Sequence, residues 1–250
     1  MNAPLRPPAP APASPPALAQ IPDPAAVVLR IGLVILAEAA LLAGLLFRGA
    51  GTVDWEWAWA LFLVAGASGL PAVLGLARHD PALLASRTRL APRDQPLEDR
   101  IFVPLHTLLV LAWAWVTGHD AARLHWLPVP EGVKALALLA IPAITWAGYR
   151  TLRDNPYLAP CVCVQEDRAH RVIDTGAYAV VRHPFYAVAI AYQAAAALVL
   201  GSLLGLIGTA LIGLTFAARI GIEERFLRQN LPGYAAYTRV TRWRLVPGLW

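Results

Sequence analysis

The residues best suited to chemistry lie in a polar stretch from Gln165 to Tyr186. It contains His170, Arg182 and His183, whose side chains can bind anions or move protons. Pro184 follows His183, and a proline in the first position of a helix loses only an amide that would have no partner there. We therefore expect a helix to begin at Pro184. Free amides near Arg182 and His183, at its positive end, could bind a carboxylate.

A second group that could carry chemistry is Arg219 with Glu223. These residues are four apart, so on a helix they share one face. Residues 185–218 separate the two groups and contain no formal charge. That segment is too long for one membrane span and is interrupted at Gly201 and Ser202, so we predict a tight helical hairpin. The hairpin would bring Arg219 and Glu223 towards the Arg182 and His183 end.

The composition places these residues in a membrane protein. Of 250 residues, 58% are apolar and 15% are charged, against about 25% charged in soluble domains. Two cysteines are too few for a disulfide-stapled fold or a zinc ribbon. The net charge of +5 comes from arginines between apolar segments rather than along one polar face, which argues against nucleic acid as a partner. Neither a dinucleotide-binding glycine motif nor a P-loop is present.

We predict an all-α integral membrane protein with about six transmembrane helices, a C-terminal helical hairpin and a cytosolic cofactor pocket. The expected spans are 25–47, 55–77, 101–116, 133–149 and the two arms of the hairpin. Residues 1–24 hold nine prolines and are predicted to be a disordered tail. Residues 25–150 would form a four-helix region, and 151–250 a region with the cytosolic loop, hairpin and tail.

Loop charges predict the orientation of these spans. With both termini in the cytosol, eighteen basic residues fall on the inner side and three, Arg48, Arg123 and Lys134, on the outer side. This strong positive-inside bias also favours an even number of spans. The expected protein is multi-pass, and the bilayer is one of its partners.

The C-terminal motifs together resemble the isoprenylcysteine carboxyl methyltransferase family, which is related to the phospholipid methyltransferases. They are Gly176-Ala-Tyr178, Arg182-His-Pro-Phe-Tyr186, Arg219-x-x-x-Glu223-Glu, Pro232-Gly-Tyr-Ala-Ala-Tyr237 and Arg244-Leu-Val-Pro247. The resemblance covers roughly Asn155 to Pro247, whereas the four N-terminal spans carry no motif that we can match.

The resemblance implies an integral membrane enzyme that uses S-adenosylmethionine. It implies that Glu223 contacts the cofactor and that Arg219 holds a substrate carboxylate. His183 would be the first candidate for a general base if the acceptor were an amine or hydroxyl. The implied cofactor pocket comprises Gln165, His170, Arg171, Val172, Ile173, Tyr178, Arg182, His183, Pro184, Phe185, Tyr186 and Glu223.

The residue types suit this cofactor independently, because it needs a carboxylate for its ammonium, donors for its carboxylate and aromatic surface for its ring. The resulting hypothesis is methyl transfer to a lipophilic small molecule or lipid-modified substrate, for example an isoprenylcysteine-type carboxylate. A phospholipid amine or a small thiol stays open as acceptor. The alternatives are a nicotinamide-dependent membrane reductase and a non-catalytic transporter or assembly factor.

Other polar residues have simpler interpretations. We expect Glu224 to lie on a solvated helix surface, and His106 to form a hydrogen bond between helices. Cys161 and Cys163 are expected to be reduced and structural, without a metal. Glu38 lies in the middle of the first span, where a carboxylate needs a partner. A contact to another helix is favoured there, with a role in substrate access as the alternative.

Overall fold

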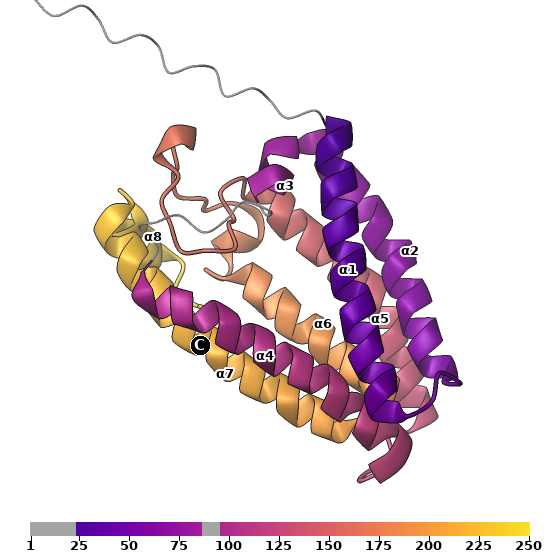
Figure 1. Ribbon diagram of the computed structural model, residues 1–250. Helices are drawn as coiled ribbons and strands as arrows, with labels where there is room; N and C mark the ends of the chain where they lie inside the picture. Colours follow the sequence, from indigo (N-terminus) through magenta and orange to yellow (C-terminus); the bar gives the residue numbers. More distant parts are fainter. Residues whose placement is uncertain (1–23, 87–95) are drawn as a thin grey trace, which may run out of the picture.

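The computed structural model describes residues 24–86 and 96–250, and these residues form a helical bundle (Figure 1). The predicted disordered tail falls almost entirely on residues outside the described ones, as do three arginines of the inner loop, Arg87, Arg89 and Arg93. Within the described ranges the structure has helices and a single isolated bridge between Val181 and Trp243. The predicted all-α class is confirmed.

Six apolar helices make up the bundle. Among the described residues, five helices are long and apolar enough to cross a membrane, and α6, with 17 residues, is a shorter apolar helix. Their bounds are Pro24–Ala50 (α1), Glu56–His79 (α2), Leu97–His119 (α4), Glu131–Asp154 (α5), Pro184–Leu200 (α6) and Leu203–Asn230 (α7). The protein is therefore a multi-pass membrane protein. Its orientation in the membrane stays a prediction.

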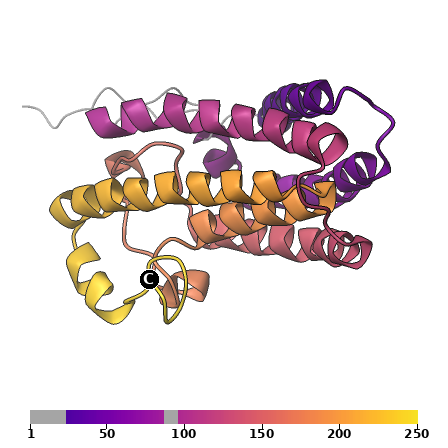
Figure 2. The ribbon, with the colours of Figure 1, turned by 90° about the horizontal axis from the view of Figure 1, so that it is seen from below.

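The predicted hairpin consists of α6 and α7. Helix α6 begins at Pro184, as expected, and ends at Leu200. Gly201 follows it, and its φ of 81° is a left-handed conformation that glycine adopts without strain. Ser202 then caps α7 by accepting a hydrogen bond from the amide of Gly205. Helix α4 packs along α7, and α5 packs along α6 (Figure 2).

The helices are packed most closely at the end opposite the polar loops. A Cβ atom added to Gly118 of α4 would lie 2.0 Å from the carbonyl oxygen of Leu46 in α1, so only glycine permits this approach. Asp120, in the π-helix Asp120–Leu124 (η1), is 1% exposed and accepts a hydrogen bond of 2.7 Å from Ser202. That contact joins the end of α4 to the hairpin turn.

Polar contacts also join α4 to α7 inside the bundle. Trp113 donates a hydrogen bond of 2.8 Å to the carbonyl of Gly205. The Nδ1 atom of His106 lies 3.1 Å from the hydroxyl of Thr215, which confirms the predicted interhelical role of this histidine. These bonds fix α4 beside the arm of the hairpin that carries Arg219 and Glu223.

The opposite end carries the short elements and the loops. They are α3 (Pro81–Ser86), η2 (Glu166–Arg168), η3 (Gly176–Ala179) and α8 (Tyr234–Val240). The chain after α8 returns to the start of α6, where the amides of Arg182 and His183 donate to the carbonyls of Trp243 and Arg244, both at 2.9 Å. The amides of Arg182 and His183 are therefore not among the free amides expected at this end of the helix. The C-terminal tail uses them instead.

Candidate functional site

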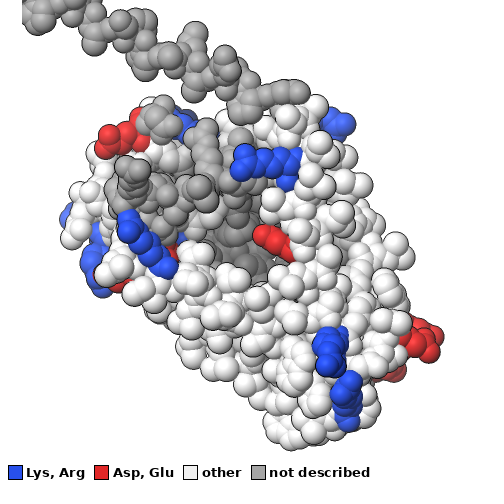
Figure 3. All heavy atoms as spheres, viewed as in Figure 1, with Lys and Arg blue, Asp and Glu red and all other residues white. Residues whose placement is uncertain are grey.

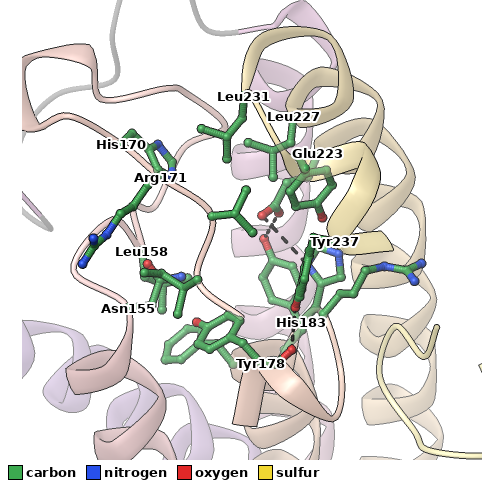
Figure 4. A pocket seen from close by; sticks show the side chains of 16 residues that line it. Asn155, Leu158, His170, Arg171, Tyr178, His183, Glu223, Leu227, Leu231 and Tyr237 are labelled. Atoms are coloured by element: carbon green, nitrogen blue, oxygen red, sulfur yellow. Dashed lines mark hydrogen bonds and ion pairs between the residues drawn. The ribbon is translucent and has the colours of Figure 1, made fainter. Parts of the chain in front are cut away.

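A cavity of about 540 Å³, partly open to solvent, lies between the loop 155–183, the start of α6, the end of α7 and α8 (Figure 4). This volume includes the part of the cavity that is open to solvent. The lining residues are Asn155, Leu158, His170, Arg171, Val172, Ile173, Tyr178, Arg182, His183, Phe185, Tyr186, Glu223, Leu227, Leu231, Tyr234 and Tyr237.

Glu223 supplies the acidic group of this cavity. Its carboxylate accepts a hydrogen bond of 2.7 Å from the hydroxyl of Tyr186, and Nδ1 of His183 lies 3.9 Å from its other oxygen. The Glu223 side chain is 20% exposed, so it is held in place yet remains accessible from the cavity. It can therefore accept hydrogen bonds from a bound cation or donor.

The neighbouring carboxylate, Glu224, has a different environment. It is 3% exposed, and its oxygens lie 2.6 Å from Nε of Arg182, 3.3 Å from Nε2 of His183 and 3.3 Å from Nε of Arg244. Arg228 approaches to 3.5 Å. The prediction that Glu224 lies on a solvated surface is wrong, because adjacent residues of α7 point in different directions and this one points at a cluster of arginines.

His183 lies between the two carboxylates. Its two ring nitrogens approach Glu223 and Glu224, and its ring stacks on Tyr186 with the centroids 5.7 Å apart. The imidazole is thereby fixed at the wall of the cavity, 6% exposed. Arg182 also borders the cavity, but its guanidinium is bound to Glu224 and to the carbonyls of Thr241 and Arg242. It joins the C-terminal tail to α6.

The aromatic wall is provided by tyrosines from η3 and α8. Burial raises the pKa of Tyr178 and Tyr234, and it raises the pKa of Tyr237 to about 12. The three phenols are therefore neutral near pH 7 and can donate hydrogen bonds. Tyr237 donates to the carbonyl of Tyr178 over 2.7 Å. The Tyr178 hydroxyl meets no hydrogen-bond geometry within the described residues, although the side chain of Asn155 approaches it.

The loop side of the cavity holds His170. Its ring stacks on Tyr157 with the centroids 4.3 Å apart, and burial together with the charge of Arg168 lowers its pKa to about 4. His170 is therefore neutral near pH 7. Arg171 is exposed and extends away from Glu223 in Figure 4.

Three of the predicted site residues do not line the cavity. Gln165 organises the loop, since its amide donates to the carbonyl of Tyr157 and accepts from Arg168. Pro184 is buried at the start of α6. Arg219 lies on the other side of Tyr186, with its guanidinium centre 6.0 Å from that ring and 4.8 Å from the ring of Phe102.

Arg219 already has an anionic partner in this chain. Its Nη2 atom lies 3.2 Å from Oδ1 of Asp99, which is fully buried, and donates a short hydrogen bond to the carbonyl of Pro160. The adjacent cysteines, Cys161 and Cys163, are reduced, with their sulfurs 3.8 Å apart. The hydrogen bond between the two thiols lowers the pKa of Cys161 to about 7.

The sequence reasoning missed six lining residues. They are Asn155, Leu158, Leu227, Leu231, Tyr234 and Tyr237. Two signals were available: Leu227 lies four residues after Glu223, so it shares the same helical face, and the two α8 tyrosines are three apart. Asn155 and Leu158 gave no comparable signal, because an irregular loop positions them.

The comparisons agree with the motifs. The model of the isoprenylcysteine carboxyl methyltransferase (ICMT) family matches residues 152–229, which is less than half of the chain. This match confirms the resemblance over the end of α5, the loop and the α6–α7 hairpin. No curated protein matches the chain. A membrane methyltransferase is therefore the class that the family match supports. Outside the matched residues, Leu231 and the α8 tyrosines complete the cavity.

Proposed function

We propose that the protein transfers a methyl group from S-adenosylmethionine, bound in the cavity, to a lipophilic acceptor that reaches the site from the bilayer. The single observation that carries this proposal is the placement of Glu223. It is an accessible carboxylate beside His183 in an aromatic cavity, inside the segment that matches a methyltransferase family.

The donor set of the cavity fits this cofactor. Glu223 can bind the ammonium, and Tyr178, Tyr234 and Phe185 offer aromatic surface for the adenine ring. The Tyr178 hydroxyl is a buried donor without a partner of ideal geometry among the described residues, so a ligand could satisfy it. When bound, S-adenosylmethionine supplies a methyl group on a positively charged sulfur.

The side chains of this chain would act by positioning. Tyr186 holds the Glu223 carboxylate, and Glu224 holds the ring of His183, so both cavity groups are fixed before a ligand arrives. Such preorganisation aligns the reacting groups, which matters most for an in-line displacement. His183 is also the cavity group best placed to accept a proton from an acceptor that carries one.

A transfer experiment tests the proposal. Membranes containing the protein are incubated with methyl-labelled S-adenosylmethionine, and label is followed into lipid, protein and volatile fractions. We expect label in one of these fractions, lost at least ten-fold in Glu223→Ala and His183→Ala. Glu131→Gln, at the opposite end of the bundle, is the matched control and should keep the wild-type level. Equal labelling in membranes with and without the protein would contradict the proposal.

A further inference from the structure

Glu38 of α1 is a carboxylate at membrane depth that the site described so far does not use. It lies near the middle of α1, is exposed, and makes no hydrogen bond or ion pair with any described residue. A carboxylate surrounded by hydrocarbon is unfavourable unless a cation or a donor pairs with it. The residue therefore requires a partner that the described part of the chain does not supply.

The direction in which Glu38 points follows from helical spacing. Val27, Ile31, Glu38, Leu42 and Gly49 are spaced by four, seven, four and seven residues, so they form one stripe along α1. The ends of this stripe are buried: Val27 and Ile31 pack near α2 and α3, and Gly49 packs on α4. Glu38 thus lies on the bundle-facing side of α1, and its exposure means that the bundle is open there.

Helix α4 also changes from buried to exposed along the side that faces α1. Its stripe towards α1 contains Gly118 and Ala114, which are buried, and then Thr107 and Val103, which are exposed. The two helices therefore touch at one end and separate towards the polar loops, as Figure 1 shows. The surface is hollowed between α1 and α4 in Figure 3. We call this opening the α1–α4 cleft.

The cleft reaches the depth of the candidate site. Leu46 of α1 packs in the same apolar cluster as Ala195 of α6, and the two helices run in the same direction. Glu38 lies eight residues before Leu46 on α1, and Ala187 lies eight residues before Ala195 on α6. In both helices this is a distance of about 12 Å towards the polar loops. Ala187 follows Tyr186, which holds Glu223. Glu38 therefore lies at about the level of the first turn of α6.

The charges near this level favour one kind of acceptor. Arg219, the cation that could hold an acidic acceptor, is paired with the buried Asp99. Glu38, in contrast, forms no ion pair with any cation of the described residues. We propose that the α1–α4 cleft binds a lipophilic primary amine and that Glu38 pairs with its nitrogen. This inference rests on the proposed methyltransferase function and names its acceptor class.

The chemistry of such an acceptor balances with Glu38 as the base. An alkylammonium passes its proton to the Glu38 carboxylate, because two charges are less stable in an apolar cleft than a neutral hydrogen-bonded pair. The nitrogen lone pair then forms the bond to the methyl carbon while the carbon–sulfur bond breaks, and that electron pair stays on sulfur. The methylated product leaves as an ammonium with its two N–H protons, and Glu38 releases to water the one proton that it accepted.

The test uses the full chain in nanodiscs of phosphatidylcholine, a lipid that carries no primary amine. Transfer of labelled methyl groups is measured with dodecylamine, with dodecanoate of the same chain length, or with phosphatidylethanolamine added to the disc. We expect label in an amine and not in dodecanoate, with at least a ten-fold loss in Glu38→Gln and partial retention in Glu38→Asp. Glu131→Gln is the control. Label in dodecylamine would indicate a single-chain acceptor, and label in phosphatidylethanolamine would indicate a phospholipid headgroup.

Binding of S-adenosylmethionine to the same nanodiscs separates this inference from the proposed function. Glu38→Gln should bind the cofactor like the wild type and melt at the same temperature, since its side chain is exposed and makes no hydrogen bond or ion pair with the described residues. Wild-type cofactor binding together with labelling of dodecanoate, or with amine labelling unchanged by Glu38→Gln, would overturn the inference. Absence of cofactor binding in the wild type would instead overturn the proposed function.

Discussion

A buried carboxylate lies at each end of α7, Asp120 of η1 at its start and Glu224 near its end, and the two are stabilised in different ways. At the closed end, Asp120 accepts from the Ser202 hydroxyl and the amide of Leu204, so neutral donors and the positive end of the helix stabilise its charge. At the end near the loops, Glu224 is surrounded by arginines and His183. The closed end joins helices, whereas the other end also builds the wall of a cavity.

This difference indicates which end of the bundle can bind a ligand. Around Asp120 the helices approach so closely that Gly118 has no room for a side chain. Around Glu224 the helices separate, and the preceding residue, Glu223, faces an open space. Changes at the closed end should therefore affect stability alone. Changes near the loops should divide into those that affect stability and those that affect ligand binding.

The largest expected effect on stability is that of Glu224→Ala. It leaves the Arg182 guanidinium, 7% exposed, without its carboxylate, and losing one partner of a buried pair costs about 3–5 kcal/mol. A strongly lowered melting temperature in detergent is the expected result, with a displaced C-terminal tail that proteases cut faster. Arg225→Ala, at an exposed position one residue on, is the control. A melting temperature equal to that of the control would contradict the stabilising role of Glu224 at the end near the loops.

Asp120→Ala should have the next largest effect. It leaves the Ser202 hydroxyl and the Leu204 amide unpaired in a buried environment, which corresponds to about 1–3 kcal/mol for each unsatisfied group. Thermal unfolding should shift accordingly, while cofactor affinity of the folded variant stays at the wild-type value. Asp54→Ala, in an exposed turn, is the matched control. A selective loss of cofactor affinity would show that the closed end is not purely structural.

Gly118→Ala tests the close approach of α1 and α4. The added methyl group would overlap the Leu46 carbonyl, and overpacking of this kind usually costs about 1–3 kcal/mol. Gly132→Ala adds the same group where nothing lies within 4 Å, so it serves as the control. We expect only Gly118→Ala to lower the melting temperature. Equal melting of the two variants would show that the helices can separate without loss.

The smallest expected effect is a pH dependence from His170. Its folded pKa of about 4 lies below its ordinary value of 6.5, so the unfolded chain binds a proton first as the pH falls. The stabilising contribution is complete above about pH 6.5 and decreases as the pH falls towards 4. His170→Gln should reduce the change of melting temperature between these pH values, whereas His79→Gln, at an exposed position, should leave that change as it is. An unchanged slope would contradict the buried, neutral state of His170.

Much of the fold follows from the sequence, because apolar length and charge position are strong signals in a membrane protein. The charge-free segment and its Gly201-Ser202 break predicted the hairpin, and Pro184 predicted the start of α6. The helix bounds extend past the predicted spans, since helices continue beyond the hydrocarbon into the loops. The direction of Glu224 could not be predicted, because it depends on Arg182, which precedes α6, and on Arg244, which the tail after α8 brings in.

The candidate site was predictable in part for a related reason. Motif residues such as Tyr178, His183 and Glu223 line one cavity, but Arg219 faces Asp99 across a helix pair. Asp99 lies 120 residues before Arg219, and no local pattern connects two residues so far apart. The tyrosines of α8 enter through a turn at Gly233, whose φ of 86° folds the chain back over α7.

The central claim is that Glu223 and the surrounding cavity bind S-adenosylmethionine, and a ligand-induced melting shift tests it most directly. The detergent-solubilised protein is melted with and without S-adenosylmethionine or S-adenosylhomocysteine. A ligand at 100 times its Kd adds about 2.7 kcal/mol to the folded state. The account predicts a raised melting temperature for wild type and Glu131→Gln, and no shift for Glu223→Ala or His183→Ala. An unchanged wild-type melting curve at saturating ligand would contradict it.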